Sequence, residues 1–136
     1  MLVVDDDPPT LAWVAQMISH CEYEIRVAYG GAEAVSVAKD FHPDCVVTGI
    51  VMPNMDGFEE AKEILKFLPN CKFILMSGSA HLQEIQDGHK ALGFDLRLLL
   101  EKPFTLAELL AALQFAGFPR VAPSQNKFSS MFTDYS

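Results

Sequence analysis

Long apolar runs are missing from this sequence. No segment approaches the ~20 consecutive apolar residues that cross a membrane as a helix. The first residues also lack the basic stretch with which a signal peptide begins. A membrane-spanning or secreted protein is therefore not expected, and we predict a cytoplasmic one.

Basic residues are few. Ten lysines and arginines stand against eighteen aspartates and glutamates, so the formal net charge is −8, and the cations are scattered without a basic stripe. An acidic surface repels nucleic-acid phosphates and anionic lipid headgroups. Neither nucleic acid nor a membrane surface is an expected partner.

Cysteines are also few, and odd in number. The three cysteines, Cys21, Cys45 and Cys71, are far apart in the sequence, and each lies in or beside an apolar segment. Disulfide frameworks and cysteine metal sites have even or closely spaced cysteines. The pattern predicts reduced side chains that pack in the interior of a cytosolic protein.

What the sequence does contain is the composition of a globular protein. Its 136 residues are 50% hydrophobic and 21% charged, which is enough for one domain with a sizeable core. From about Pro119 the chain turns polar and loses its periodicity. We therefore predict a domain over residues 1–118 and a polar C-terminal tail or linker stub over residues 119–136.

Short apolar runs alternate with helical patterns along the chain. Five such strand-then-helix units predict a mostly parallel sheet with helices on both faces, which is a doubly wound α/β fold. Pro8-Pro9 suits the first turn of a helix, and Thr105 with Glu108 has the spacing of a capping box. The predicted strands are residues 2–4, 23–29, 44–50, 73–76 and 96–100, and the predicted helices cover residues 8–20, the segment around 34–38, 58–68, 81–92 and 106–113.

Polar side chains gather at the carboxyl ends of the first, fourth and fifth predicted strands. Doubly wound sheets bind ligands at this edge. Carboxylates are hard oxygen ligands for Mg²⁺, and ammonium and hydroxyl groups hydrogen-bond to phosphate oxygens. The edge therefore suits a magnesium ion and a phosphoryl group. The side chains concerned are Asp5, Asp6, Asp7, Ser77, Ser79 and Lys102.

Four motifs along this edge resemble those of a known family. They are "LVVDDD" at residues 2–7, "MPNMDG" at 52–57, "LMSGSA" at 75–80 and "EKPFT" at 101–105. With these motifs in this order over roughly residues 1–117, the chain closely resembles the receiver domain of two-component response regulators. The resemblance implies a flavodoxin-like (βα)5 sheet with strand order 2-1-3-4-5.

The sequence departs from this family at the phospho-acceptor position. In the family, the third strand ends in an aspartate that accepts a phosphoryl group from a histidine kinase, four residues before the proline of the "MP" motif. Counting back from Pro53 gives Gly49, which has no nucleophile. The neighbouring Thr48 is not a substitute, because adjacent strand residues point to opposite faces. Asp56 is predicted to cap the third helix.

The resemblance also implies a metal site around the acceptor position. Asp5 and Asp6 match the acidic pair, with Asp6 as the direct Mg²⁺ ligand, and Val51 would offer its backbone carbonyl. The carboxylate missing at position 49 predicts that Mg²⁺ binding is weakened or vacant, so no cofactor is firmly expected. With no anion to offset its charge, Lys102 is expected to pair with Asp5 or Asp6 as a structural ion pair.

The remaining matches belong to the family's phosphate-sensing groups. Ser77 matches the switch hydroxyl, and Lys102 matches the phosphate-binding lysine, which is usually joined to the following proline, here Pro103, by a cis peptide bond. The aromatic switch position, three residues before the lysine, holds Leu99. That departure weakens the expected coupling between the site and the output face.

These features predict a non-enzymatic, receiver-like signalling domain of a two-component phosphorelay that acts without aspartyl phosphorylation. Its expected partners are proteins: a histidine kinase, a phosphotransfer protein or an output protein. The resemblance implies that they contact the face of the fourth helix, fifth strand and fifth helix, where a homodimer is also an option.

Other functions stay open. A small nucleotide- or flavin-binding enzyme on the same fold needs a glycine-rich phosphate loop, but residues 5–9 are acidic and rich in proline, and no such motif occurs. The chain also fits a receiver fragment of a larger regulator or hybrid histidine kinase. The pattern does not distinguish a natural Gly49 from an introduced one.

Overall fold

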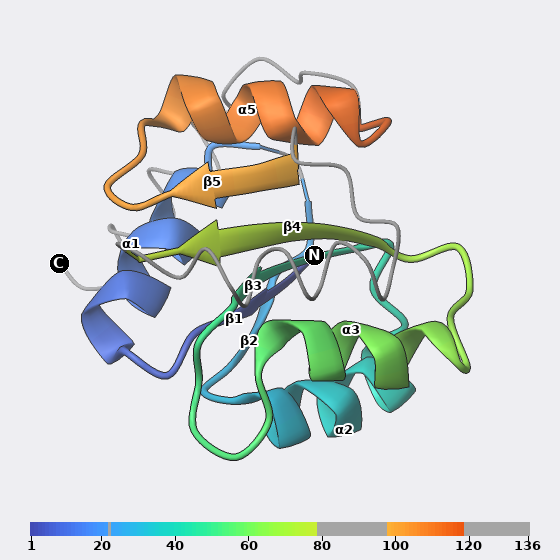
Figure 1. Ribbon diagram of the computed structural model, residues 1–136. Coiled ribbons are helices and arrows are strands. Elements are labelled where there is room, and N and C mark those ends of the chain that lie inside the picture. Colours follow the sequence, from blue (N-terminus) through green and yellow to red (C-terminus); the bar gives the residue numbers. More distant parts are fainter. Residues whose placement is uncertain (22, 79–97, 119–136) are drawn as a thin grey trace, which may run out of the picture.

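Five parallel strands form one sheet in the order β2-β1-β3-β4-β5 (Figure 1). The computed structural model describes residues 1–21, 23–78 and 98–118. The order confirms the predicted flavodoxin-like doubly wound fold. The strands are β1 (Leu2–Val4), β2 (Arg26–Ala28), β3 (Cys45–Gly49), β4 (Lys72–Ser77) and β5 (Leu99–Glu101).

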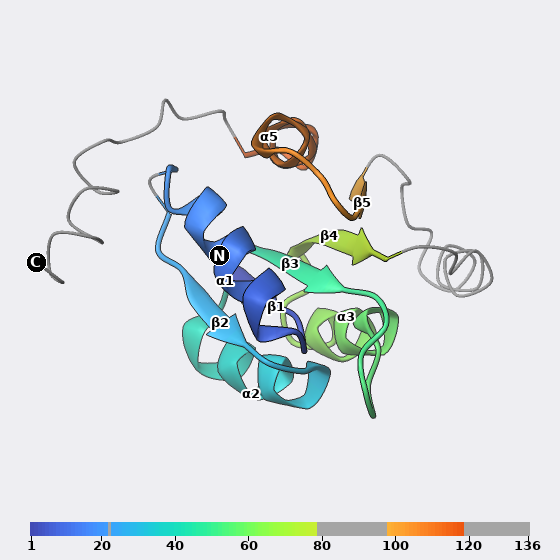
Figure 2. The same cartoon turned by 90° about the vertical axis from the view of Figure 1, so that its left-hand side faces the viewer.

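Helices cover both faces of the sheet. In Figure 2, α1 (Pro8–Ile18) and α5 (Leu106–Phe115) lie on one side, and α2 (Gly31–Phe41) and α3 (Gly57–Leu65) lie on the other. Two apolar cores result, because alternate strand residues point to opposite faces. Val3 and Val47 pack with α1 and α5, whereas Leu2, Val4 and Val46 pack with α2 and α3. The predicted helix over residues 81–92 lies outside the described residues.

Several predicted boundaries were too wide. β2 was expected over residues 23–29 but covers only Arg26–Ala28, because its sole neighbour in the sheet is the three-residue strand β1. α3 was expected to run to residue 68 but ends at Leu65. β5 begins at Leu99, and residues 96–97 of the predicted strand lie outside the described ranges.

Local capping determines where the helices begin. Asp7 caps α1, with prolines in the first two positions of the helix. Asp56 and Thr105 form capping boxes with Glu59 and Glu108 at the starts of α3 and α5. The predictions for Asp56 and for the Thr105–Glu108 pair are therefore confirmed. Among the described residues, no helix is long and apolar enough to cross a membrane.

The three cysteines are free and buried, as predicted. Burial raises the pKa values of Cys45 and Cys71 to about 12. Both thiols therefore stay protonated at neutral pH and act as small apolar groups in the interior.

Candidate functional site

The sheet order brings the predicted site residues to one edge. Asp5 follows β1, Gly49 ends β3, Ser77 ends β4 and Lys102 follows β5. These strands are parallel and adjacent in the order β1-β3-β4-β5, so their carboxyl ends lie next to one another. Residues from four separate parts of the chain therefore meet at the edge where this fold class binds its ligands.

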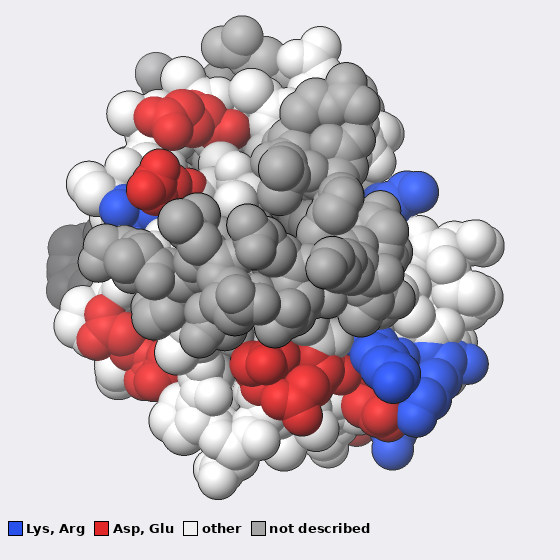
Figure 3. Space-filling view, viewed as in Figure 1, with Lys and Arg blue, Asp and Glu red and all other residues white. Residues whose placement is uncertain are grey.

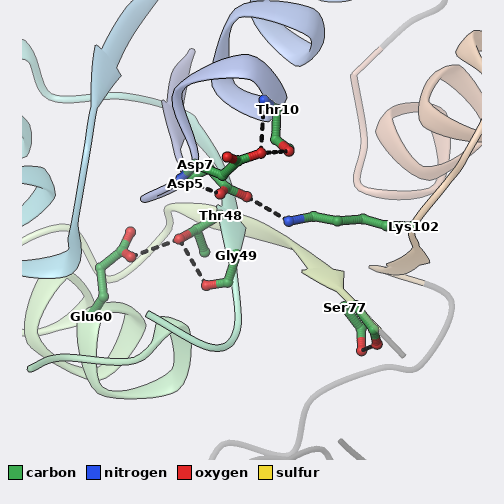
Figure 4. Close-up of polar contacts among 9 residues, drawn as sticks. Asp5, Asp7, Thr10, Thr48, Gly49, Glu60, Ser77 and Lys102 are labelled. Carbon is green, nitrogen blue, oxygen red and sulfur yellow. Dashed lines mark hydrogen bonds and ion pairs between the residues drawn. The ribbon is translucent and has the colours of Figure 1, made fainter. Parts of the chain in front are cut away.

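An ion pair between Asp5 and Lys102 dominates this edge. The Lys102 ammonium nitrogen Nζ lies 2.7 Å from Asp5 Oδ2, and the Asp7 backbone N–H donates to Asp5 Oδ1 at 2.9 Å (Figure 4). The Asp5 side chain is only 2% exposed, and that of Lys102 is 28% exposed. Of the two partners expected for Lys102, the structure therefore selects Asp5, while Asp6 is exposed.

Gly49 faces this ion pair directly. A Cβ atom added to Gly49 would lie 3.2 Å from Asp5 Oδ2 and 3.8 Å from Met52 Cγ. A side chain at position 49 would therefore project against the carboxylate that holds Lys102. The position that the sequence assigns to the missing acceptor is within the site.

The next helix packs closely on the same strand end. A Cβ atom on Gly57 would lie 2.3 Å from the Gly49 carbonyl oxygen, far inside contact distance, so only glycine fits there. The Gly57 N–H donates to the Ile50 carbonyl at 2.7 Å. The first turn of α3 is thus fastened to the residues that follow β3.

Ser77 and Leu99 do not join the ion pair. The Ser77 hydroxyl donates to the Gly78 carbonyl at 2.7 Å, and Figure 4 shows it lying apart from Asp5 and Lys102. Leu99 packs against Ile50, Phe58 and Leu75 instead of presenting a ring at the site. The Lys102–Pro103 peptide bond is cis, as predicted.

The donor set does not fit the implied magnesium site. Both Asp5 oxygens already accept hydrogen bonds, one of them from a cation. Asp6 and Val51 are exposed. Among the described residues, no group of three or more His, Cys, Asp or Glu side chains is arranged to hold a metal ion. A magnesium ion would have to displace Lys102 from Asp5, because Mg²⁺ needs close carboxylate ligands.

One buried polar pair was not predicted. Thr48 Oγ1 lies 2.7 Å from Glu60 Oε2, and both side chains are 0% exposed (Figure 4). Burial raises the pKa of Glu60 to about 8, partly offset by the hydrogen bond with Thr48. A signal for this pair exists in the sequence: Glu60 falls at helical spacing on the buried face of α3 with Gly57, Ala61 and Ile64. The expectation that Thr48 points away from the acceptor side agrees with this contact.

Surface charge varies over the molecule. Figure 3 shows acidic side chains at several places on one face and a group of basic side chains at its lower right. The pKa of Glu63 is lowered mainly by Lys66, through a hydrogen bond and through its charge. The charges of Lys62 and Lys39 lower it further. These lysines lie beside an acidic side chain, so they do not form an uninterrupted basic surface.

The sequence matches one known protein family and several relatives. The family model described as the response regulator receiver domain matches residues 1–114. The chain is 33% identical over 114 residues to the chemotaxis protein CheY of Thermotoga maritima, covering 83% of this chain and 92% of that protein. It is 29% identical over 133 residues to the response regulator MprA of Mycobacterium sp. strain KMS, covering 98% of this chain and 56% of that protein.

Solved structures show the same similarity. The receiver domain of a response regulator from Clostridium thermocellum superimposes with a TM-score of 0.75 at 26% sequence identity, covering 85% of this chain and 90% of that chain. The present chain spans little more than half the length of its MprA relative but nearly all of CheY. The matched region includes every strand of the sheet described above.

Proposed function

The chain belongs to the response regulator receiver domain family of two-component systems, and from this premise we propose that it signals through protein contacts without aspartyl phosphorylation. One observation carries the proposal: β3 ends in Gly49, next to the Asp5–Lys102 pair. Glycine has no side-chain oxygen that could accept a phosphoryl group. The alternative of a nucleotide- or flavin-binding enzyme is not supported by the comparisons.

The electrostatics of the site support the same proposal. An anionic partner stabilises the Lys102 ammonium group at this edge, because its side chain is partly buried. Asp5 supplies that anion from within the chain at 2.7 Å. The site is thus neutralised internally and needs neither a metal ion nor a phosphoryl group for its charge balance.

The proposed partners are proteins. β5 and α5 form part of the face expected to contact a histidine kinase, a phosphotransfer protein or an output protein, and the same face would serve a homodimer. We further propose a cytoplasmic location, a receiver domain over residues 1–118 and a tail or linker over 119–136, which lies outside the described residues. The coverage of MprA supports the idea of a receiver segment within a larger regulator.

The test is a phosphorylation assay with acetyl phosphate and Mg²⁺, read by intact mass and by acid lability of the adduct. The wild type is expected to gain no phosphoryl group. Gly49→Asp is expected to gain one, once Asp5 moves by a few tenths of an ångström to relieve the 3.2 Å contact. Gly30→Asp is the matched control, because a Cβ atom at Gly30 has no neighbour within 4 Å, whereas one at Gly49 lies 3.2 Å from Asp5 Oδ2.

Two outcomes would contradict the proposal. A stoichiometric acid-labile phosphate on the wild type would mean that another residue serves as acceptor. Labelling of Gly30→Asp to the same extent as Gly49→Asp would mean that the added carboxylate reacts without help from the site.

A further inference from the structure

The Glu60 carboxyl group is the most unusual buried group in the described part of the chain. It is 0% exposed, and its Oε1 atom has no hydrogen-bond partner among the described residues. Its other oxygen, Oε2, lies 2.7 Å from Thr48 Oγ1. An ionised carboxylate with one unsatisfied oxygen in an apolar core is strongly disfavoured, whereas a protonated carboxyl group is tolerated.

Thr48 connects this carboxyl group to the strand end. Its hydroxyl oxygen lies 2.7 Å from Glu60 Oε2 and 3.3 Å from the Gly49 carbonyl oxygen. A hydroxyl group has only one proton to donate. When Glu60 is ionised, Thr48 donates to Oε2; when Glu60 is protonated, it donates to Thr48, and the Thr48 proton is free for the Gly49 carbonyl. The proton on Glu60 therefore determines whether Gly49 receives this hydrogen bond.

The Gly49 carbonyl is well placed to pass on such a change. It lies against Gly57 at the start of α3, where no Cβ atom would fit. The Ile50 N–H donates to the Met76 carbonyl at 2.9 Å, and the Ile50 carbonyl accepts from Gly57. A shift of the peptide between residues 49 and 50 is therefore transmitted to β4 and to the first turn of α3.

Among the residues that the structure describes, two titratable groups interact with Glu60. Asp56, in the N-cap position of α3, raises the pKa of Glu60 further, and the Cys71 thiol lies close enough to be affected by Glu60 in turn. From α2, the buried residues that face the shared core are Ala34 and Ala38, which carry no charge. With desolvation as the largest cause, the pKa of Glu60 is raised to about 8, so both protonation states are accessible near neutral pH.

We propose that Glu60, Thr48 and the Gly49 carbonyl form a proton-responsive relay that sets the conformation of the β3–α3 junction. The relay rests on the proposed function, since it would give the domain an input at the strand end where the phosphoryl acceptor is missing. In this scheme the ligand that distinguishes the two states is a proton. It binds to the carboxyl group of Glu60, a residue that is 0% exposed.

Nuclear magnetic resonance tests the relay on the full chain. The side-chain carboxyl carbon of Glu60 and the backbone amides of Gly49, Ile50 and Gly57 are followed across a pH series that brackets the value of about 8. The amide shifts are expected to follow the same midpoint as the Glu60 carbon. Ile50 and Gly57 are suitable reporters because both N–H groups are hydrogen-bonded and thus protected from rapid exchange.

Three variants identify the source of the signal. Glu60→Gln is expected to hold the three amides at their low-pH positions throughout the series. Thr48→Val keeps the shape of the side chain but removes the hydroxyl, so Glu60 should still titrate while the Ile50 and Gly57 amides no longer follow. Thr48→Ser retains the hydroxyl and is expected to preserve the coupling.

The relay would be overturned if the amide shifts persisted unchanged in Glu60→Gln, since they would then not arise from Glu60. It would equally be overturned if Glu60 titrated near 4.5, its ordinary value, or if Thr48→Val behaved like the wild type. These results are separable from the phosphorylation assay. Acid-labile phosphate on the wild type overturns the proposed function, whereas pH-independent Gly49 and Ile50 amides overturn the relay.

Discussion

Replacing Lys102 should lower the free energy of unfolding more than replacing its partner Asp5. Lys102→Met removes the cation from the Asp5 carboxylate, whose side chain is 2% exposed. Of the donors among the described residues, the Asp7 N–H then remains. Stranding a buried charge in this way costs about 3–5 kcal/mol. Asp5→Asn leaves instead an ammonium group whose side chain is 28% exposed and can turn toward water, while the asparagine Oδ1 still accepts from Asp7.

The expected cost of Asp5→Asn is therefore about 1.5–3 kcal/mol, the range for loss of a hydrogen bond to a charged group. The midpoints of the two ranges differ by about 2 kcal/mol, with Lys102→Met the costlier change. Urea unfolding at pH 7 and about 0.15 M salt, followed by circular dichroism, measures both free energies of unfolding. The double variant completes a cycle that isolates the coupling between the two side chains.

A surface ion pair provides the matched control. Lys66 lies 2.8 Å from Glu63, but the two side chains are 62% and 42% exposed. Lys66→Met should therefore change the free energy of unfolding by at most about 1 kcal/mol. The reasoning is refuted if Asp5→Asn costs as much as Lys102→Met, or if Lys66→Met costs as much as Lys102→Met.

Three further predictions concern the β3–α3 junction and the helix caps. Gly57→Ala should lower the free energy of unfolding by about 1–3 kcal/mol, because its Cβ atom would meet the Gly49 carbonyl at 2.3 Å; an unchanged urea midpoint would rule out this close contact. Because the pKa of Glu60 is raised from 4.5 in the unfolded chain to about 8 in the folded one, its contribution to stability is fully present below pH 4.5 and lost as pH rises through 8. Between these two limits the free energy of unfolding should change by at most about 5 kcal/mol, and Glu60→Gln should remove this change. The prediction is contradicted if the free energies of unfolding of both proteins vary with pH in the same way. Thr105→Ala removes the capping-box acceptor of the Glu108 N–H and should cost about 1 kcal/mol in urea unfolding, whereas Thr105→Ser should cost much less.

Sequence patterns determined the fold class and, through the resemblance to a known family, the strand order. The apolar runs and helical spacings are local features, and the motifs at the four strand ends resemble a family of known topology. The caps at Asp56 and Thr105 were predictable for the same reason, because a capping box involves residues only three positions apart. The assignment of Gly49 to the acceptor position rests on counting back from Pro53 and stays a prediction.

Only the tertiary structure decided how the side chains at the site are paired. Lys102 and Asp5 are 97 positions apart, and the choice of Asp5 over Asp6 depends on which carboxylate faces Gly49 from the end of β1. The pairing of Glu60 with Thr48 likewise depends on how α3 is rotated against β3. Local propensity specifies that a helix or strand forms, but the direction of a side chain relative to a distant element is set by packing, and packing here determines where each charge is neutralised.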